Sequence, residues 1–449
     1  MTFNTGQIID NSNVDYFVAA LCLKKHPLVK KSRKVSAKYY IALEYIAKRC
    51  TSNPVFVNER LLQYKKALFG NVVAPKPSAE DQHRAIRKII FSPFKPWLAK
   101  YRFLLLCDLA LVLLDKSAIQ QAYTMLAGYL SSKQASLIHS FWDALLVGEP
   151  TSIYRAFTND LIMQLQANWE FVEQVEQRYI VTANVSAGKS TLINALVGKP
   201  VRRTSQETCT SYPGYIYSKP FKDGLVHLSA ERLVLNATYD ELMLSERDAT
   251  IDIASYFCIL GGSPKRICII DTPGANSAIY REHGRRVSKT LREESYNKLI
   301  YIFNANRLGT DEEFRHLKFI ADNVEEKKII FVLNKLDEFN KRDDSIKESI
   351  KGVRDDLSRY GYKNPTICPL SACYAFLIKK KLNGYPLTSD ELDEYSLYAN
   401  KFSKSEHDLS QYYPPTSTFL NASHDRTLDM AVKCGLYGFE NILYGGANE

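Results

Sequence analysis

Apolar residues recur every three or four positions over residues 14–176, where glycine and strand-like runs are scarce. This spacing places apolar side chains on one face of a helix, so this half of the chain is predicted to be all-helical. Members of one such series are Tyr39, Ile41, Leu43 and Ile46. A break over residues 71–80 contains Pro75 and Pro77 and predicts a loop or a joint between two helical subdomains.

The most apolar run of the chain, residues 103–114, has twelve residues and includes Asp108. A helix needs about 20 apolar residues to cross a bilayer, so the run is too short to do so. It is predicted to form a buried helix.

After Glu176 the pattern changes to short apolar or β-branched runs that alternate with amphipathic stretches. This alternation predicts βαβ units, and therefore a mostly parallel sheet flanked by helices. We expect a helical domain at 1–170 and an α/β domain at 171–449. The expected strands are residues 179–182, 266–270, 299–303, 329–333 and 366–369.

The first of these strands runs into a phosphate-binding loop and then a helix that ends near Gly198. The loop's backbone N–H groups and the helix N-terminus can bind phosphate oxygens, Lys189 can reach the β- and γ-phosphates, and Ser190 can bind Mg²⁺. Ala183 stands where the P-loop pattern has its first glycine. An alanine is tolerated at this position only if its φ is negative. The nucleotide-binding residues expected here are Asn184, Val185, Ser186, Ala187, Gly188, Lys189, Ser190 and Thr191.

Three further segments follow predicted strands in the order that a GTPase requires. Asp271 and Gly274 form a DxxG element, in which the carboxylate holds Mg²⁺ through water and the glycine N–H meets the γ-phosphate. Asp337 can accept hydrogen bonds from N1–H and N2–H₂ of guanine, a donor pair that adenine lacks. The base pocket is expected to consist of Asn334, Lys335 and Asp337 with Ser371 and Ala372. GTP or GDP is therefore the predicted ligand, and residues 171–449 are predicted to form an α/β P-loop GTPase domain.

Charge is distributed unevenly along the chain. Residues 1–100 carry 18 Lys and Arg against 6 Asp and Glu, whereas the other 349 carry 41 against 43. The basic residues are densest over 24–38, where they could meet an anionic membrane, a partner protein or nucleic acid, or only keep the surface solvated. The nine cysteines include no CxxC pair, and the N-terminus has no secretory pattern. We therefore expect a reducing, cytoplasmic location, with peripheral membrane contact as an option.

Over residues 177–445 the sequence resembles the bacterial dynamin-like GTPases of the dynamin superfamily. Ser186 matches the P-loop serine of that family, and Thr210 with Pro213 matches its switch threonine, although Thr208 is a rival. Residues 304–312 and 434–440 also resemble family segments. Sixty-one positions separate Thr210 from Asp271, which is comparable to the insertion that dynamin-like domains carry.

The resemblance assigns catalytic roles to Ser186, Lys189 and Thr210. It implies that Ser186 helps to place a monovalent cation, K⁺ or Na⁺, between the phosphates. It makes Thr210 the switch threonine, which orients water and joins Ser190 and Asp271 around Mg²⁺. It further implies a homodimer through the GTPase domains, with Arg202 and Arg203 as candidate contacts across that dimer or as solvated loop cations.

Family members normally continue into a helical stalk, whereas this sequence stops at Glu449. The helical N-terminal half could replace the stalk, a partner could supply it, or the GTPase could work without remodelling membranes. Two alternatives to a membrane-associated dynamin-like GTPase stay open. They are a regulatory or RNA-associated GTPase switch and a GTP-controlled protein-assembly module.

Overall fold

The computed structural model describes residues 11–70, 78–91, 100–147, 156–184, 186–204, 213–245, 250–272, 290–339, 345–415 and 425–445. The chain divides into two compact units. Unit 1 comprises Met1–Val175 and Lys219–Ala237, and unit 2 comprises Glu176–Ser218 and Thr238–Glu449. A segment inside the predicted GTPase-domain range therefore clusters with the helical unit. Of the predicted break at 71–80, residues 71–77 lie outside the described residues.

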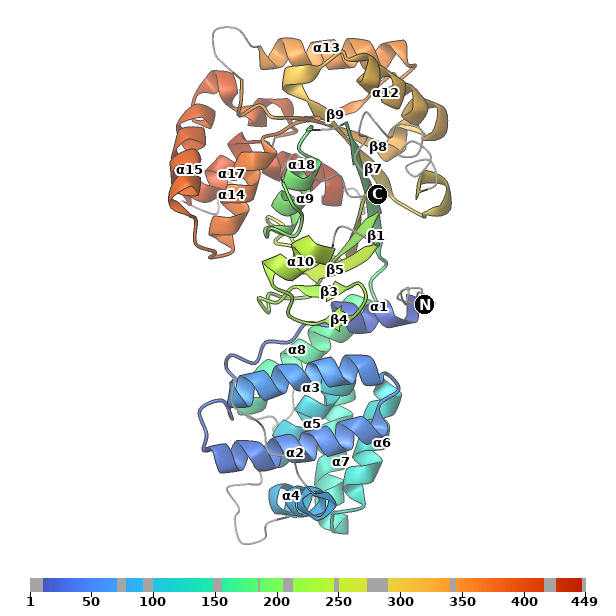
Figure 1. Cartoon of the computed structure of the whole chain (residues 1–449), viewed down its shortest axis with the longest axis vertical. Helices are drawn as coiled ribbons and strands as arrows, with labels where there is room; N and C mark the ends of the chain where they lie inside the picture. Colours follow the sequence, from blue (N-terminus) through green and yellow to red (C-terminus); the bar gives the residue numbers. More distant parts are fainter. Residues whose placement is uncertain are drawn as a thin grey trace. The chain divides into compact units, whose positions relative to one another are not determined.

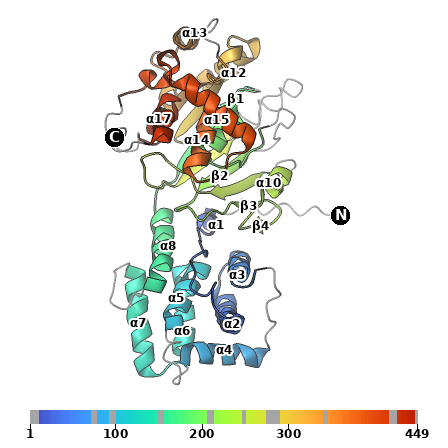
Figure 2. The ribbon, with the colours of Figure 1, turned by 90° about the vertical axis from the view of Figure 1, so that its left-hand side faces the viewer.

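Unit 1 is helical, as the apolar spacing predicts (Figures 1 and 2). Its helices are α1 (Asn11–Val18), α2 (Arg33–Cys50), α3 (Pro54–Phe69), α4 (Ala79–Phe91), α5 (Lys100–Leu113), α6 (Lys116–Ala127), α7 (Ser132–Val147) and α8 (Ala156–Val172). The segment Lys219–Ala237 adds the short antiparallel strands β3 (His227–Ser229) and β4 (Leu233–Val234).

Helix α5 is the centre of unit 1, and it packs against the helices from α2 to α8. It is apolar on all sides, which is the pattern of a helix buried all round. Leu104, Leu105 and Cys107 are fully buried in it. The predicted buried helix over residues 103–114 is thus present.

Asp108 of α5 is fully buried and accepts three hydrogen bonds. Tyr39 Oη lies 2.5 Å and Tyr64 Oη 2.8 Å from its carboxylate oxygens. His26 Nδ1 accepts the Leu28 N–H at 3.3 Å, so Nε2 carries the proton and donates to Asp108 at 2.9 Å. Buried carboxylates are tolerated when they are paired in this way. The contact fixes the loop between α1 and α2 that carries the basic residues.

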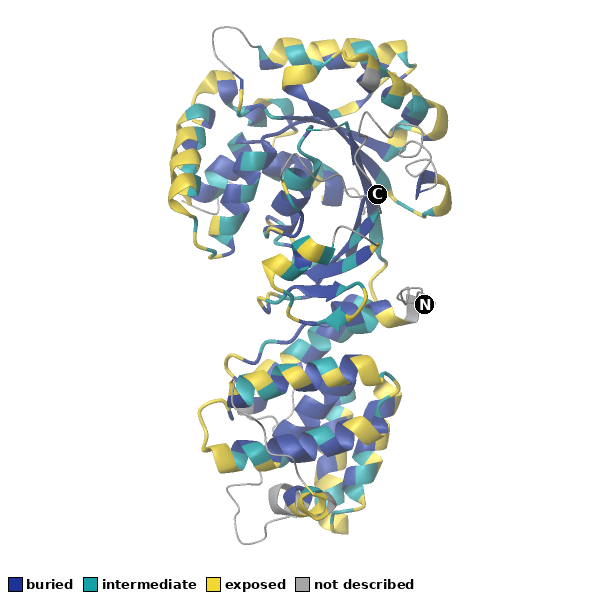
Figure 3. Ribbon diagram, viewed as in Figure 1, coloured by how far each residue is buried: buried dark blue, intermediate teal, exposed yellow. Residues whose placement is uncertain are grey.

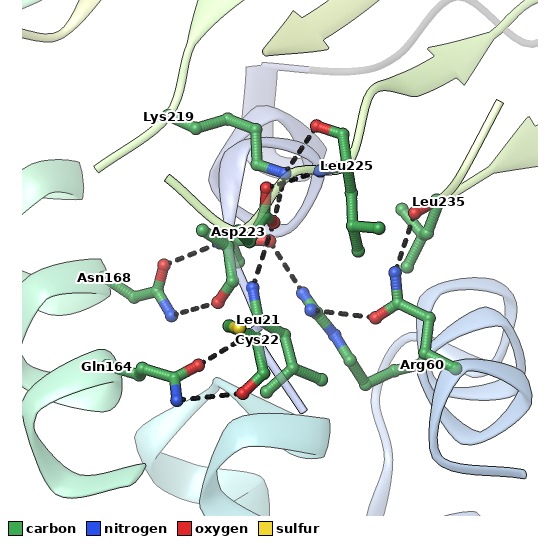
Figure 4. A network of polar contacts seen from close by, with 12 residues as sticks. Leu21, Cys22, Arg60, Gln164, Asn168, Lys219, Asp223, Leu225 and Leu235 are labelled. Atoms are coloured by element: carbon green, nitrogen blue, oxygen red, sulfur yellow. Dashed lines mark hydrogen bonds and ion pairs between the residues drawn. The ribbon is translucent and has the colours of Figure 1, made fainter. Parts of the chain in front are cut away.

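A second polar network in unit 1 holds an extended stretch between α1 and α2 (Figure 4). Asn168 of α8 pairs with the backbone N–H and carbonyl of Ala20 at 2.8 and 3.0 Å. Asp223 accepts the Leu21 N–H at 3.2 Å and pairs with the buried Lys219. The hydrogen bond from Leu21 N–H to Asp223 therefore ties the segment Lys219–Ala237 to the stretch between α1 and α2.

Unit 2 is an α/β domain. Its strands are β1 (Gln177–Ala183), β2 (Gly214–Ser218), β5 (Ile251–Ser255), β6 (Ile267–Asp271), β7 (Lys298–Asn304), β8 (Ile329–Asn334) and β9 (Thr366–Pro369). Its α-helices are α9 (Lys189–Val197), α10 (Tyr239–Ser245), α12 (Asp311–Asn323), α13 (Ile346–Arg359), α14 (Ala372–Leu382), α15 (Ser389–Phe402), α17 (Arg426–Lys433) and α18 (Leu436–Gly445).

The strands of unit 2 follow the order β5-β2-β6-β1-β7-β8-β9. All these neighbours pair in parallel except β2 and β6, which are antiparallel. Helices lie on both faces of the sheet, α9 and α14 on one and α12 on the other (Figure 1). The strands are largely buried and the outer helix faces are exposed (Figure 3). The predicted fold and its five strands are confirmed, and β2 and β5 add to them.

The topology explains where a ligand has to bind. Strands β1, β6, β7, β8 and β9 run in parallel, so their carboxyl ends meet at one edge of the sheet. In such sheets the loops at that edge form the binding crevice. None of the described helices is long and apolar enough to cross a lipid bilayer.

Candidate nucleotide-binding site

The loop between β1 and α9 has the backbone of a phosphate cradle. Ser186 and Gly188 both have positive φ, 63° and 91°. Gly188 has to be glycine for a second reason, because a Cβ there would overlap the side-chain amide of Asn334. Among the described residues no side chain caps the N-terminus of α9. The first-turn N–H groups, which include those of Lys189, Ser190 and Thr191, can therefore bind an anion.

Ala183, the departure from the P-loop pattern, is the last residue of β1. It is 2% exposed and is not among the residues with positive φ. The strand therefore accepts the methyl group without backbone strain, which meets the condition that the sequence set for this position.

An asparagine and a histidine from other elements support the loop. Asn304, at the end of β7, donates from Nδ2 to the Ser186 carbonyl at 3.2 Å and so holds a non-glycine residue in the left-handed region. His316 of α12 lies 3.2 Å from Asn184 Oδ1 through Nδ1 and 3.4 Å from Thr182 Oγ1 through Nε2. An amide oxygen only accepts, so Nδ1 carries the proton and Nε2 accepts from the threonine.

The phosphate side of the site contains a buried charge cluster. Asp271 ends β6 and is 2% exposed. One of its oxygens pairs with Lys189, and the other lies 3.0 Å from Arg202 Nε. Arg202 is itself 3% exposed. Arg202 is therefore a buried partner of Asp271 within its own chain. The two roles expected from the sequence, a contact across the dimer and a solvated loop cation, do not describe this arrangement.

On the base side, the Asn334 amide is bound at both ends. Its Nδ2 donates to the Ala187 carbonyl at 2.8 Å, and its Oδ1 accepts the Ala372 N–H at 2.9 Å. One side chain thus connects the phosphate loop, the end of β8 and the start of α14. The next residue, Lys335, has φ 70° and turns the chain toward Asp337.

The carboxylate that would read the base is Asp337. Ser371 donates to its Oδ1 at 2.6 Å, and Lys401 of α15 donates to its backbone carbonyl at 2.5 Å. Burial raises the pKa of Asp337, while the Ser371 hydrogen bond acts to lower it. The base-binding residues named from the sequence are thus brought together, with Lys401 as an addition.

The residues present fit a magnesium nucleotide. Lys189 and the α9 N-terminus suit phosphate, and Ser190 and Asp271 are oxygen donors of the kind that Mg²⁺ prefers. Among the described residues no group of three or more His, Cys, Asp and Glu could hold a metal by itself. Magnesium commonly binds through few protein oxygens together with phosphates and water, so this donor set suits a shared ion. Val185, Thr208, Thr210 and Gly274 lie outside the described residues.

Residues 180–336, which span the loop, Asp271 and Asn334, match the family model described as the dynamin family. This segment belongs to the dynamin family. The dynamin-family match begins within β1, continues through β8 and ends one residue before Asp337.

Two curated relatives match parts of the chain. An uncharacterized protein in the xynA 3′ region of Caldicellulosiruptor sp. (strain Rt8B.4) is 29% identical over 237 residues, which are 51% of this chain and 55% of that protein. A probable transmembrane GTPase, FZO-like and chloroplastic, of Arabidopsis thaliana is 27% identical over 198 residues, 43% of this chain and 19% of that protein. The chain thus spans about half the length of one relative and a fifth of the other.

Solved structures give looser matches. A bacterial dynamin from an oligomerised pair described as sensing and tethering membranes is 17% identical, with a TM-score of 0.35 over 86% of this chain and 69% of that chain. Toc33 from Arabidopsis thaliana with Mg²⁺ and GMPPNP is 15% identical, with a TM-score of 0.31 over 49% of this chain and 80% of that one. TM-scores this low do not define a shared fold, so the family assignment comes from the sequence match.

Several residues around the dynamin-family site were not expected from the sequence. Asn304 could have been found, because it directly follows a predicted strand at the ligand-binding edge. His316 and Lys401 lie within helices, and nothing in their sequence context marks them. Their contacts with the loops depend on how the helices pack.

The His316 ring predicts a pH dependence of stability. Desolvation lowers its pKa to about 4. The unfolded chain binds this proton below about pH 6.5 and the folded chain only near pH 4, so stability falls as pH falls through that window. In urea titrations, the difference in unfolding free energy between wild type and His316→Gln should shrink by roughly 1–3 kcal/mol between pH 7 and pH 4.

The His83→Gln variant is the control, because His83 is an exposed histidine of unit 1. Its difference from wild type should change much less over the same range. A His316→Gln difference that stays constant with pH would show that the ring is not held neutral.

Proposed function

We propose that unit 2 binds GTP and GDP with Mg²⁺ and hydrolyses GTP to GDP and phosphate. The observation that carries the proposal is the Asn334 side chain, which binds the Ala187 carbonyl and the Ala372 N–H. It sets a phosphate loop and a base-reading carboxylate in one continuous site. Membership of the matched segment in the dynamin family supports the same activity.

Guanine selectivity comes from Asp337. A carboxylate can accept from both N1–H and N2–H₂ of guanine, and adenine presents no such pair. The Ser371 hydroxyl, 2.6 Å from Oδ1, orients the carboxylate. Because Asp337 is partly buried, a base that left its carboxylate unpaired would bind less favourably, since burying an unpaired charge raises the free energy of the complex.

The phosphates would meet Lys189 and the N–H groups at the start of α9. Ser190 and Asp271 would hold Mg²⁺, which neutralises charge between the phosphates. Lys189 pairs with Asp271 in the structure, so binding of the phosphates redirects its ammonium group. The family resemblance adds Thr210 for the attacking water and Ser186 for a monovalent cation, K⁺ or Na⁺.

GTP-dependent pairing of two GTPase domains is a further part of the proposal. It rests on the family resemblance, in which pairing across the nucleotide orders the P-loop serine, here Ser186.

The basic segment of unit 1 is proposed to contact an anionic membrane or a partner protein. Its cations are all exposed, and they are Lys24, Lys25, Lys30, Lys31, Arg33, Lys34 and Lys38. His26, in the middle of the segment, is buried against Asp108 and anchors it. The plant relative is named a probable transmembrane GTPase, which favours the membrane of the two partners.

The guanine assignment is tested by Asp337→Asn. The amide offers both an acceptor and a donor, so it suits xanthine, whose C2 carries a carbonyl in place of the amino group. We expect affinity for GDP to fall at least about a hundredfold and affinity for XDP to rise, as measured with fluorescent nucleotides. The control is Asp355→Asn, at an exposed residue of α13, which should bind as wild type. An unchanged preference for guanine would remove the basis of the assignment.

Pairing predicts that turnover depends on protein concentration. GTP turnover per molecule should rise several-fold between nanomolar and micromolar protein in wild type, because pairing completes the catalytic site. Ser186→Ala should bind nucleotide but lose most of that rise. Turnover that stays flat in wild type would contradict pairing, whereas turnover that is absent throughout would contradict hydrolysis itself.

Membrane contact is tested with a charge-reversal variant in which Lys30, Lys31, Arg33 and Lys34 become glutamate. Wild type should sediment with phosphatidylserine-containing vesicles at low salt and less at high salt, and the variant should stay in solution. A variant with the same four changes at Lys347, Lys351, Arg354 and Arg359 of α13 controls for net charge. Equal sedimentation of both variants would exclude a specific role for the basic segment.

A further inference from the structure

Arg202 is a buried arginine beside a buried carboxylate. Its side chain is 2% exposed, as is that of Asp271, and Nε lies 3.0 Å from Asp271 Oδ2. The other carboxylate oxygen pairs with the Lys189 ammonium group. Both oxygens of the carboxylate that is expected to face Mg²⁺ are therefore bound by cations of the chain itself.

The backbone of Arg202 is fixed from the phosphate-binding helix. Asn194, on α9, accepts the Val201 and Arg202 N–H groups on Oδ1 at 2.9 and 2.8 Å. Its Nδ2 donates to the Arg202 carbonyl at 2.8 Å. Asn194 is 1% exposed, so this is a buried clamp that uses its acceptor and its donor. The clamp holds the residue from which the guanidinium reaches Asp271.

Space for the guanidinium is provided by Gly214. This residue pairs with Asp271 in the antiparallel register of β2 and β6. A Cβ on Gly214 would overlap the Arg202 guanidinium, and no other neighbour of that Cβ is closer. Gly214 is not among the glycines with positive φ, so its backbone does not require glycine. The missing side chain therefore serves the arginine.

The electrostatics of this cluster change when a metal arrives. In this cluster two cations share one carboxylate. Their attraction to it offsets part of the free-energy cost of burying the three charged groups. Mg²⁺ near Asp271 brings two further positive charges into a site where solvent screening is weak. Phosphate oxygens can take over Lys189, whereas Arg202 is clamped by Asn194 and keeps its hold on the carboxylate.

We propose that Arg202 is a positioning residue that acts as the internal counter-cation of Asp271, and that Mg²⁺ competes with its guanidinium for this carboxylate. The inference rests on the proposed function, since it concerns magnesium that enters with a guanine nucleotide. Arg202 keeps Asp271 in place when the metal is absent and raises the magnesium concentration needed for nucleotide binding. It thereby makes nucleotide retention sensitive to magnesium.

The test is a magnesium titration of nucleotide binding to the full chain. Binding of N-methylanthraniloyl-GDP is measured from excess EDTA to 10 mM free Mg²⁺. Arg202→Gln keeps hydrogen-bond donors but removes the charge. The magnesium midpoint, which is the free Mg²⁺ concentration at half-maximal nucleotide binding, should therefore fall by about tenfold. Its melting temperature without nucleotide in EDTA should also fall by several degrees, because Asp271 loses one of its two cations. The matched control is Arg203→Gln, at a partly exposed neighbour, and it should leave both values unchanged.

Gly214→Ala is the second variant, and it keeps every charge. Its methyl group displaces the guanidinium, so the magnesium midpoint should fall as in Arg202→Gln. Gly214→Ala still tests the inference if the Arg202→Gln protein does not fold. Arg202→Lys retains a cation and should stay closer to wild type than the glutamine variant.

Either of two results would overturn the inference. An unchanged magnesium midpoint in both Arg202→Gln and Gly214→Ala would show that no competition exists. A higher midpoint, or weaker GDP binding at saturating Mg²⁺, would show that Arg202 supports the bound nucleotide instead. If wild type binds no guanine nucleotide at any magnesium concentration, the proposed function fails and the cluster is structural.

Discussion

The arrangement of the nucleotide site depends on the two hydrogen bonds of the Asn334 amide. One bond fixes the carbonyl of Ala187 in the phosphate loop, and the other fixes the N–H of Ala372 at the start of α14. The same side chain fills the space that a Cβ on Gly188 would need. The distance between a phosphate cradle and a base pocket is thus set by one residue at the end of β8, a buried strand. A rigid strand makes that distance reproducible, whereas a loop would not.

Burial of charge is the second theme of unit 2. Asp271, at the end of β6, forms ion pairs with Lys189, at the start of α9, and with Arg202. A buried carboxylate with one counter-cation fewer would be costly, and one with a divalent metal in addition would be overcompensated. The site therefore has a charge balance that a magnesium nucleotide must rearrange. Asn194 and Gly214 are best understood as parts of that balance.

Unit 1 uses the same chemistry for a structural purpose. Asp108 binds two tyrosines and a neutral histidine in the middle of an apolar core, and Asn168 pairs with an extended backbone segment. The segment Lys219–Ala237 lies between β2 and β5 in the sequence but is held in unit 1 through Asp223. The chain therefore passes between the units at three points, after Val175, Ser218 and Ala237. The hydrogen bonds from Leu21 N–H to Asp223 and from Gln63 Nε2 to the Leu235 carbonyl attach this segment to the rest of unit 1.

Local patterns predicted the helical character of unit 1 and most strands of unit 2. The apolar period gave the helices of unit 1 and the buried α5, and short apolar runs gave five strands of unit 2 within one or two residues of their ends. Sequence spacing also placed Lys189, Asp271 and Asp337 at the carboxyl ends of strands, where topology then brought them together. The strands β2 and β5 were missed, because β2 begins with a glycine, Gly214, and Asp252 interrupts the short apolar run of β5.

By itself the sequence determined the fold class, the order of the motifs and the chemistry of the expected ligand. These depend on residues close together in the chain, through helix and strand periods and strand-end loops. The tertiary structure alone decided the pairing of Arg202 with Asp271, the contacts of His316 with the phosphate loop, and the inclusion of Lys219–Ala237 in unit 1. Each joins groups that are distant in sequence or that only packing orients, and local spacing carries no information about such contacts.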